Sequence, residues 1–270
     1  MTPGATRLLA PRPLAAAAAA VLLLLPSAAR AQTGGPPDAG GTRWSLGAGV
    51  IAAPRPYVGA DANIQPIPIV EFYSGRWFVQ GIRAGYRFVD TDALDFDVRA
   101  RFRFSGLDPD DSPFLEGMEE RRETVEVGLG LDWEFARAMG GAFELELRAF
   151  ADVLGRSDGF ESSIDLAWRK VFGPGKMILA PAVGMVYQSS DQVDYYYGVR
   201  PEEARPGRPA YEGSSVFNPR ASLLFVYRFT QRWSLTTLLS VDFFDDEIES
   251  SPIVDQSTEA FSLVGLTYSF

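Results

Sequence analysis

The chain has 270 residues, with 35 acidic and 25 basic side chains, a formal net charge of −10, and neither cysteine nor histidine. Without these two residue types, Ser–His–Asp and Cys–His catalytic sites, histidine-ligated zinc and disulfide bonds are excluded. The acidic balance also argues against nucleic acid as a partner, because it repels phosphate backbones. We therefore expect a protein that is not an enzyme and holds no cofactor.

The N-terminus has the organisation of a secretory signal peptide. Basic residues precede an apolar run over 14–25, and small residues around 29–31 form a cleavage site. The run is shorter than the ~20 apolar residues that a membrane-spanning helix needs. We expect residues 1–31 to be removed on export and the Gly/Pro-rich segment 32–43 to form a flexible periplasmic leader. The rest of the chain, 44–270, is expected to be one domain.

Apolar and polar residues alternate along many segments of this domain. Taken in chain order, the expected strands are 44–53, 64–73, two short strands within 76–89, 93–104, 122–136, 142–154, 159–172, 176–188, 214–229, 232–246 and 258–270. Several of them reach the ~9–11 residues of a membrane-spanning strand. The pattern predicts an all-β fold, a transmembrane antiparallel β-barrel of twelve strands, or of ten if 64–73 lies outside the wall. Pro66 and Pro68 suit an edge or irregular segment better than a central strand.

The strand at 93–104 has the strictest alternation. Its polar positions are all charged, and they are Asp95, Asp97, Arg99, Arg101 and Arg103. Facing lipid, each arginine would cost ~2–4 kcal/mol near the midplane, so this face is expected to line the lumen. The two aspartates form a carboxylate pair, but a charge-paired ladder with the arginines is the more economical interpretation.

Connection lengths predict the orientation of the barrel. The connections at 137–141, 173–175 and 230–232 are short, as periplasmic turns are, and those at 105–121, 189–213 and 245–257 are long, as extracellular loops are. Aromatic residues at strand ends gather near the inferred periplasmic boundary, as in a membrane girdle.

The long loops contain three short patterns. Asp108, Asp110 and Asp111 could hold calcium, although a solvated acidic loop is the simpler interpretation. Gly117, Met118 and Arg121 are expected to fold the loop over 105–121 inward, with Arg121 paired to a loop carboxylate. The run Tyr195, Tyr196 and Tyr197 is expected to pack over the barrel mouth, and a binding role is the alternative.

The C-terminal strand ends as outer-membrane barrels end. Leu266, Tyr268 and Phe270 alternate with small or polar residues, and the last residue is aromatic. Together with the export signal, this ending predicts a Gram-negative outer-membrane location. It also predicts contact with membrane lipid and lipopolysaccharide and recognition by the barrel-assembly machinery.

Six segments in order resemble the MipA/OmpV family of outer-membrane proteins, the MltA-interacting proteins. They are 54–59 (PRPYVG), 66–68 (PIP), 116–121 (EGMEER), 195–199 (YYYGV), 251–254 (SPIV) and 265–270 (GLTYSF). The resemblance implies a non-enzymatic barrel that acts as a scaffold between a murein-degrading transglycosylase and a murein synthase. Family members are also linked to adhesion or antibiotic response, so an adhesin and a small passive channel stay open as alternatives.

Overall fold

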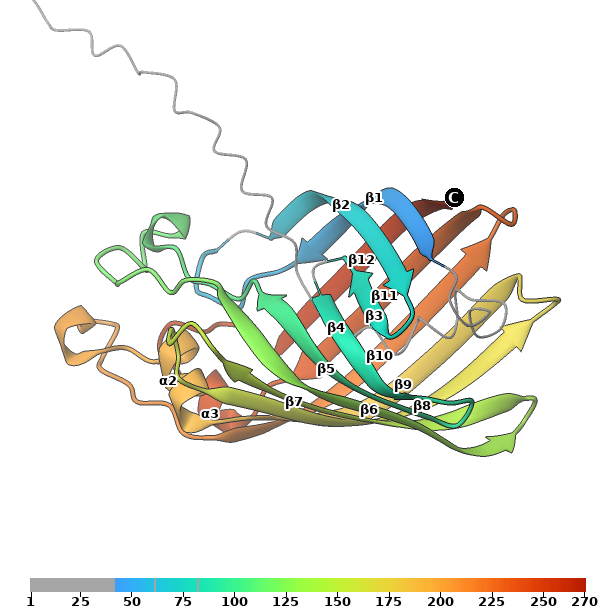
Figure 1. The fold of residues 1–270 in the computed structure, drawn as a ribbon. Coiled ribbons are helices and arrows are strands. Elements are labelled where there is room, and N and C mark those ends of the chain that lie inside the picture. The colour runs from blue at the N-terminus through green and yellow to red at the C-terminus, as the bar shows by residue number, and fades with distance from the viewer. Residues whose placement is uncertain (1–41, 61, 82) are drawn as a thin grey trace, which may run out of the picture.

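The computed structural model describes residues 42–60, 62–81 and 83–270. The expected signal peptide over 1–31, and the leader over 32–43 except for its last two residues, lie outside them. Within the described residues, twelve antiparallel strands form a closed barrel, in which neighbours in sequence are neighbours in the wall and β12 pairs with β1 (Figure 1). The twelve-strand prediction is confirmed and the ten-strand alternative is wrong.

The strands follow the alternating segments of the sequence closely. They are β1 (Arg43–Ala53), β2 (Asn63–Ser74), β3 (Trp77–Gln80), β4 (Arg83–Asp90), β5 (Leu94–Arg103), β6 (Thr124–Ala138), β7 (Gly141–Asp152), β8 (Phe160–Phe172), β9 (Met177–Gln188), β10 (Val216–Arg228), β11 (Trp233–Phe243) and β12 (Thr258–Ser269). Closure places Gly49 of β1 opposite Gly265 of β12. Pairing of the first strand with the last is how a barrel satisfies the backbone hydrogen bonds of its strands in a membrane.

The wall is incomplete beside β2, because β3 has only four residues. β3 pairs with β2 over Glu71–Ser74, and in the described residues no strand pairs with this edge of β2 from Asn63 to Val70. The carbonyl of Val70 faces this edge, where it accepts a hydrogen bond from the Gly81 amide at 2.8 Å. Pro66 and Pro68 lie at every second position before Val70, so their backbone nitrogens face the same unpaired edge. Proline has no amide hydrogen, so neither residue leaves an unpaired donor in this gap. The prolines thus lie on an edge strand, as their sequence indicated.

The two ends of the barrel differ in the length of their connections. At the turn end, β6 and β7 are joined by Met139 and Gly140, whose φ angles are +56° and +73°. Two successive positive φ values are the signature of a type I′ hairpin turn. At the loop end, the described connections include the helices α2 (Ser190–Tyr197) and α3 (Asp246–Glu249) and 3-10 turns at Pro109–Asp111 and Pro201–Glu203 (Figure 1). The tyrosine run was expected in a loop and lies in α2 instead.

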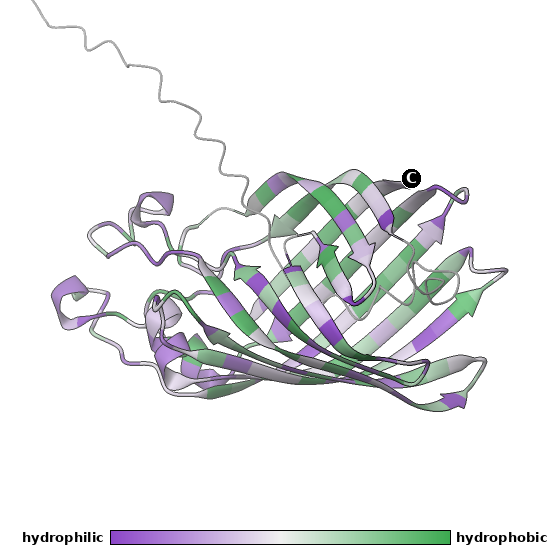
Figure 2. Ribbon diagram, viewed as in Figure 1, coloured by the Kyte–Doolittle hydropathy of each residue, from purple (hydrophilic) through white to green (hydrophobic). Residues whose placement is uncertain are grey.

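The outward face of the strands is apolar and ends in aromatic rings. Hydrophobic residues recur along the strands, whereas the loops at the left of the barrel are more hydrophilic (Figure 2). At the turn end, Trp44 contacts Phe72 and Trp233 contacts Tyr268, with ring centroids 4.9 and 5.1 Å apart. Phe270, next to this group, is 74% exposed. Among the described residues, no helix is long and apolar enough to cross a membrane.

Candidate functional site: the barrel interior and its two ends

The inward faces of β5 to β8 form a charged wall. Arg101 reaches Glu126 of β6 at 2.5 Å and Glu161 of β8 at 2.8 Å, and Arg103 binds the same two carboxylates. All four side chains are buried or nearly so. Two arginines held between two carboxylates satisfy one another's charges, which is what burial of charge requires.

A second network lies on the same wall. Arg148 of β7 bridges Asp132 and Glu146, the latter at 3.2 Å. Arg169 of β8 binds Glu144 at 2.6 Å. Arg169 also reaches Glu134 of β6 at 3.3 Å, across the intervening β7, so the ion pairs form a continuous layer on the inward face of β6 to β8.

The structure places all five residues of the expected ladder on the inward face of β5. Only Asp97 and Arg99 pair with each other. Asp95 binds Arg87 of β4 at 3.1 Å, while Arg101 and Arg103 bind across to other strands. Glu126 and Glu161 were missed as functional partners, although each occupies an alternating polar position of its own strand.

The opposite side of the interior forms an apolar wall. Its buried residues come from β1, β2 and β9 to β12, and they are Ile51, Ile67, Ile178, Ala180, Leu224, Val226, Leu238 and Phe261. On these strands apolar residues therefore occupy the inward as well as the outward face. The interior is filled on this side by packing and on the other by ion pairs.

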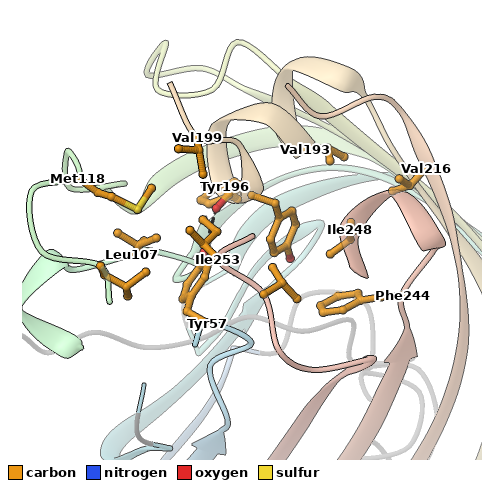
Figure 3. Close-up of a cluster of buried hydrophobic side chains, with 13 residues drawn as sticks. Tyr57, Leu107, Met118, Val193, Tyr196, Val199, Val216, Phe244, Ile248 and Ile253 are labelled. Atoms are coloured by element: carbon orange, nitrogen blue, oxygen red, sulfur yellow. Dashed lines mark hydrogen bonds between the residues drawn. The ribbon is translucent and has the colours of Figure 1, made fainter. Parts of the chain in front are cut away.

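A hydrophobic plug closes the loop end of the barrel. It consists of the buried residues Tyr57, Leu107, Leu115, Met118, Val193, Tyr196, Tyr197, Val199, Val216, Phe244, Ile248, Ile253 and Val254. These residues come from four connections between strands and from the start of β10. Figure 3 shows Tyr57 pointing toward α2, where its hydroxyl donates a hydrogen bond to the backbone carbonyl of Tyr196 at 3.3 Å.

Arg121 holds two of these connections together. Its guanidinium binds the carboxylate of Glu203 at 2.7 Å and donates to the carbonyl of Tyr195 at 2.8 Å. Glu203, in turn, accepts the amide of Glu119 at 2.8 Å. Met118 is buried in the plug, and Gly117 has a φ of +83° at the turn before it. Glu203 was not singled out in the sequence, because it lies 82 residues from Arg121 and only the fold brings the two together.

Burial in the plug changes the acid–base behaviour of its tyrosines. Burial raises the pKa of Tyr57, Tyr196 and Tyr197 above the ordinary value, because it disfavours the phenolate. These hydroxyls therefore stay protonated at neutral pH, and that of Tyr57 donates the hydrogen bond to the Tyr196 carbonyl.

Two of the three loop aspartates have carboxylates that are bound within the protein. Asp108 accepts the amide of Asp110 at 2.9 Å, and Asp111 pairs with Arg55. Among residues 42–60, 62–81 and 83–270, no three acidic side chains are grouped so that they could hold a metal ion.

A hollow lies near each end of the barrel. Beneath the plug lies a cavity of about 90 Å³, between the charged and apolar walls. At the turn end a larger hollow of about 650 Å³ is lined by Arg43, Arg228 and Arg232, by Lys176 and Glu71, and by aromatic residues such as Trp233 and Phe270. We call it the turn-end hollow.

A closed barrel with an apolar outer face, an aromatic girdle and an aromatic C-terminus defines an outer-membrane β-barrel protein. The family model for MltA-interacting protein MipA matches residues 46–270. The chain belongs to this family. The protein is thus located in the outer membrane.

Relatives with known names agree with this assignment. The MltA-interacting protein of Escherichia coli is 29% identical over 233 residues, covering 84% of this chain and 90% of that one. Outer membrane protein OmpV of Vibrio cholerae is 29% identical over 187 residues, covering 68% and 69% of the two chains. These relatives are named as interacting or outer-membrane proteins and not as enzymes.

Among solved structures, the chain is similar to the NanC porin, with a TM-score of 0.38 and 11% identity over 84% of this chain and 98% of that one. The COG4313 outer membrane channel of Pseudomonas putida gives a TM-score of 0.40 and 10% identity over 87% and 99%.

Proposed function

We propose that this protein is a non-catalytic, non-conducting anchor that docks a murein hydrolase and synthase complex at the periplasmic face of the outer membrane. The observation that carries the proposal is the difference between the two ends of the barrel. The plug fills the extracellular end with buried side chains, whereas the turn-end hollow opens the periplasmic end. A partner can therefore bind the barrel at its periplasmic end, although no open channel crosses the barrel.

The turn-end hollow has the chemistry of a docking surface. Four cationic side chains line it, against one acidic side chain, that of Glu71. Exposed aromatic rings, including Trp233 and Phe270, surround these charges. Arginine and aromatic side chains are the groups that dominate protein interfaces, and positive charge favours an acidic partner segment. The printed name of the Escherichia coli relative supports a murein enzyme as that partner.

The rest of the proposal concerns the membrane and catalysis. The outward face of the barrel contacts lipid and lipopolysaccharide, and Leu266, Tyr268 and Phe270 serve as the signal for the barrel-assembly machinery. The charged wall contains pairs of carboxylates, but these carboxylates bind arginines. The chain has no histidine or cysteine that could act as a base or nucleophile. These features support a protein that works through position and surface.

Conductance of the purified mature protein in a planar bilayer tests the closed barrel. We expect inserted protein without steady single-channel current. Steady current that a murein hydrolase leaves unchanged would replace the anchor with the passive channel.

Binding in lipid nanodiscs, where both faces are accessible, tests the docking surface. A purified lytic transglycosylase is expected to bind the wild type, and the double variant Arg43→Glu with Arg232→Glu is expected to bind about tenfold or more weakly, because it reverses charge in the turn-end hollow. The control is Arg122→Glu at the opposite end, where the side chain is exposed. Equal binding by all three proteins, or loss of binding in the control alone, would contradict docking at this hollow.

A further inference from the structure

The barrel wall has a gap between β2 and β5 in its loop-end half. The hairpin of β3 and β4 joins these two strands only in the turn-end half, where β3 pairs with β2 from Glu71 to Ser74 and β4 pairs with β5 as far as Arg101. Closer to the loops, the described part of the chain supplies no further strand between β2 and β5. We call this interval the wall gap.

The β2 edge of the wall gap offers hydrogen-bond acceptors without donors at two positions. Pro66 and Pro68 are in phase with Val70, whose carbonyl accepts the Gly81 amide at 2.8 Å, so their carbonyls face the same edge. Proline has no amide hydrogen. A strand added here would find acceptors for its amides but no donors for its carbonyls, so pairing with a second copy of the chain is disfavoured.

Apolar side chains stand on both sides of the wall gap. On β2, Ile64 is 67% exposed. On β5, Phe102 lies between the inward-facing Arg101 and Arg103 and therefore points outward, and its ring centroid is 4.4 Å from that of Phe104. These two rims suit a hydrocarbon chain, which buries apolar area against them.

The inner side of the wall gap is also apolar. Ile67 of β2 is buried in the apolar wall, and Ile69 and Phe104 pack against the same cluster. Phe104 additionally lines the cavity beneath the plug. The wall gap is thus backed by packed side chains, so an occupant lies within the wall and not in the lumen.

The position of the wall gap in a membrane defines the chemistry of its occupant. Water does not reach a backbone carbonyl in the hydrocarbon region, so a sheet edge exposed there requires a partner. That partner needs hydrogen-bond donors for the carbonyls and a hydrocarbon chain for the rims. Lipopolysaccharide has both, because hydroxyl groups and amide N–H groups occur along and at the base of its acyl chains.

We propose that the wall gap binds one lipopolysaccharide molecule of the outer leaflet. A hydroxyl or amide of its acyl chains donates to the carbonyls of Pro66 and Pro68, and a chain lies between Ile64 and Phe102. The inference rests on the orientation in the proposed function, with the loop end outside, and not on the docking partner.

Native mass spectrometry of the folded barrel, released from detergent micelles, measures which lipids stay bound. The probe is the tetra-acylated precursor of lipid A, in which every acyl chain has a hydroxyl. Tetramyristoyl cardiolipin is its matched lipid, with the same number of phosphates and of chains of equal length but without hydroxyls on those chains. We expect the wild type to retain the precursor and to retain cardiolipin about tenfold less, because only the precursor satisfies the proline carbonyls.

A pair of double variants locates the site. Ile64→Gln with Phe102→Gln makes both rims polar and should lower retention of the precursor about tenfold. The matched control is Val183→Gln with Phe217→Gln, which also replaces one aliphatic and one aromatic residue. These two are 61% and 58% exposed, but they lie where β9 and β10 pair with each other. The control should retain the precursor as the wild type does, and circular dichroism checks that both variants are folded.

Three results would overturn the proposal. They are equal retention of the two lipids by the wild type, no retention of the precursor, and equal losses in the two double variants, which would indicate general contact with lipid. A lipid-free dimer would also overturn it, because strand pairing would then fill the wall gap. The turn-end hollow is lined by neither Ile64 nor Phe102, so the gap variant should bind the lytic transglycosylase as the wild type does. Failure of the lipid site therefore leaves the docking proposal untouched, and the reverse also holds.

Discussion

The two walls of the barrel interior solve the same packing problem with different chemistry. On β5 to β8 the inward side chains are arginines and carboxylates joined into networks, such as Arg148 with Asp132 and Glu146. On β9 to β12 with β1 and β2 they include a buried cluster of aliphatic and aromatic residues, such as Leu224 and Leu238. Both sets are buried, although only the second avoids the cost of removing charge from water.

Because the two walls differ in chemistry, substitutions on them should destabilise the barrel for different physical reasons. A buried ion pair contributes little net free energy as a pair, but it becomes strongly destabilising when one partner is lost. An apolar residue contributes in proportion to the area it buries and to the cavity that its loss leaves. Substitutions on the two walls can therefore be compared through the free energy of unfolding.

The largest effect is expected on the charged wall, from Arg148→Met. The substitution keeps much of the side-chain volume but leaves Asp132 and Glu146 without their shared cation. We expect a loss of ~3–5 kcal/mol in the free energy of unfolding, measured by urea titration of the barrel in phospholipid vesicles with tryptophan fluorescence.

The control is Arg122→Met, which removes an exposed pair with Glu120 and should cost ~0–1 kcal/mol. Equal losses in the two variants would mean that the charged wall is hydrated and behaves like the outer surface.

A smaller effect is expected on the apolar wall, from Leu238→Ala. Leu238 is 1% exposed within the apolar cluster, so truncation leaves a cavity and should cost ~2–5 kcal/mol. The next residue offers the matched comparison, because Leu239 has the same chemistry but points outward and is 42% exposed. Leu239→Ala should cost less in the same urea titration. A larger loss from Leu239→Ala would show that contact with lipid, and not interior packing, stabilises this part of the wall.

The sequence predicted the barrel well where the two faces of a strand differ. Along β5 every second residue is charged, so period and phase follow directly from the residue types. On β9 apolar residues such as Ile178 and Ala180 also point inward, so alternation of polarity is weak there and length and turns had to define the strand. The helix α2 was missed, because three consecutive tyrosines have no helical preference that a short loop sequence would reveal.

The partners in the interior were harder to predict than the strands. The residues of the β5 ladder were identifiable by their alternation, yet Arg101 binds Glu161, which is 60 residues away. Such a pairing depends on strand register, tilt and side-chain reach, and one sequence does not specify these. For the same reason, the sequence around Arg121 did not indicate Glu203 as its partner.

The sharpest test of the difference between the walls replaces an ion pair by apolar residues. Arg220 of β10 and Asp242 of β11 form a bidentate pair on two strands that also contribute Leu224 and Leu238 to the apolar wall. Arg220→Met alone should cost ~3–5 kcal/mol, because Asp242 loses its cation. The double variant, Arg220→Met with Asp242→Leu, removes both charges and should change stability by only about 1 kcal/mol.

A double-mutant cycle in urea measures the coupling between the two sites, which share one ion pair and are therefore expected to be non-additive. If the two single losses instead add in the double variant, the pair stabilises the barrel through separate contacts of each side chain. The charged wall would then owe its stability to packing, as the apolar wall does, and the contrast between the walls would be one of composition alone.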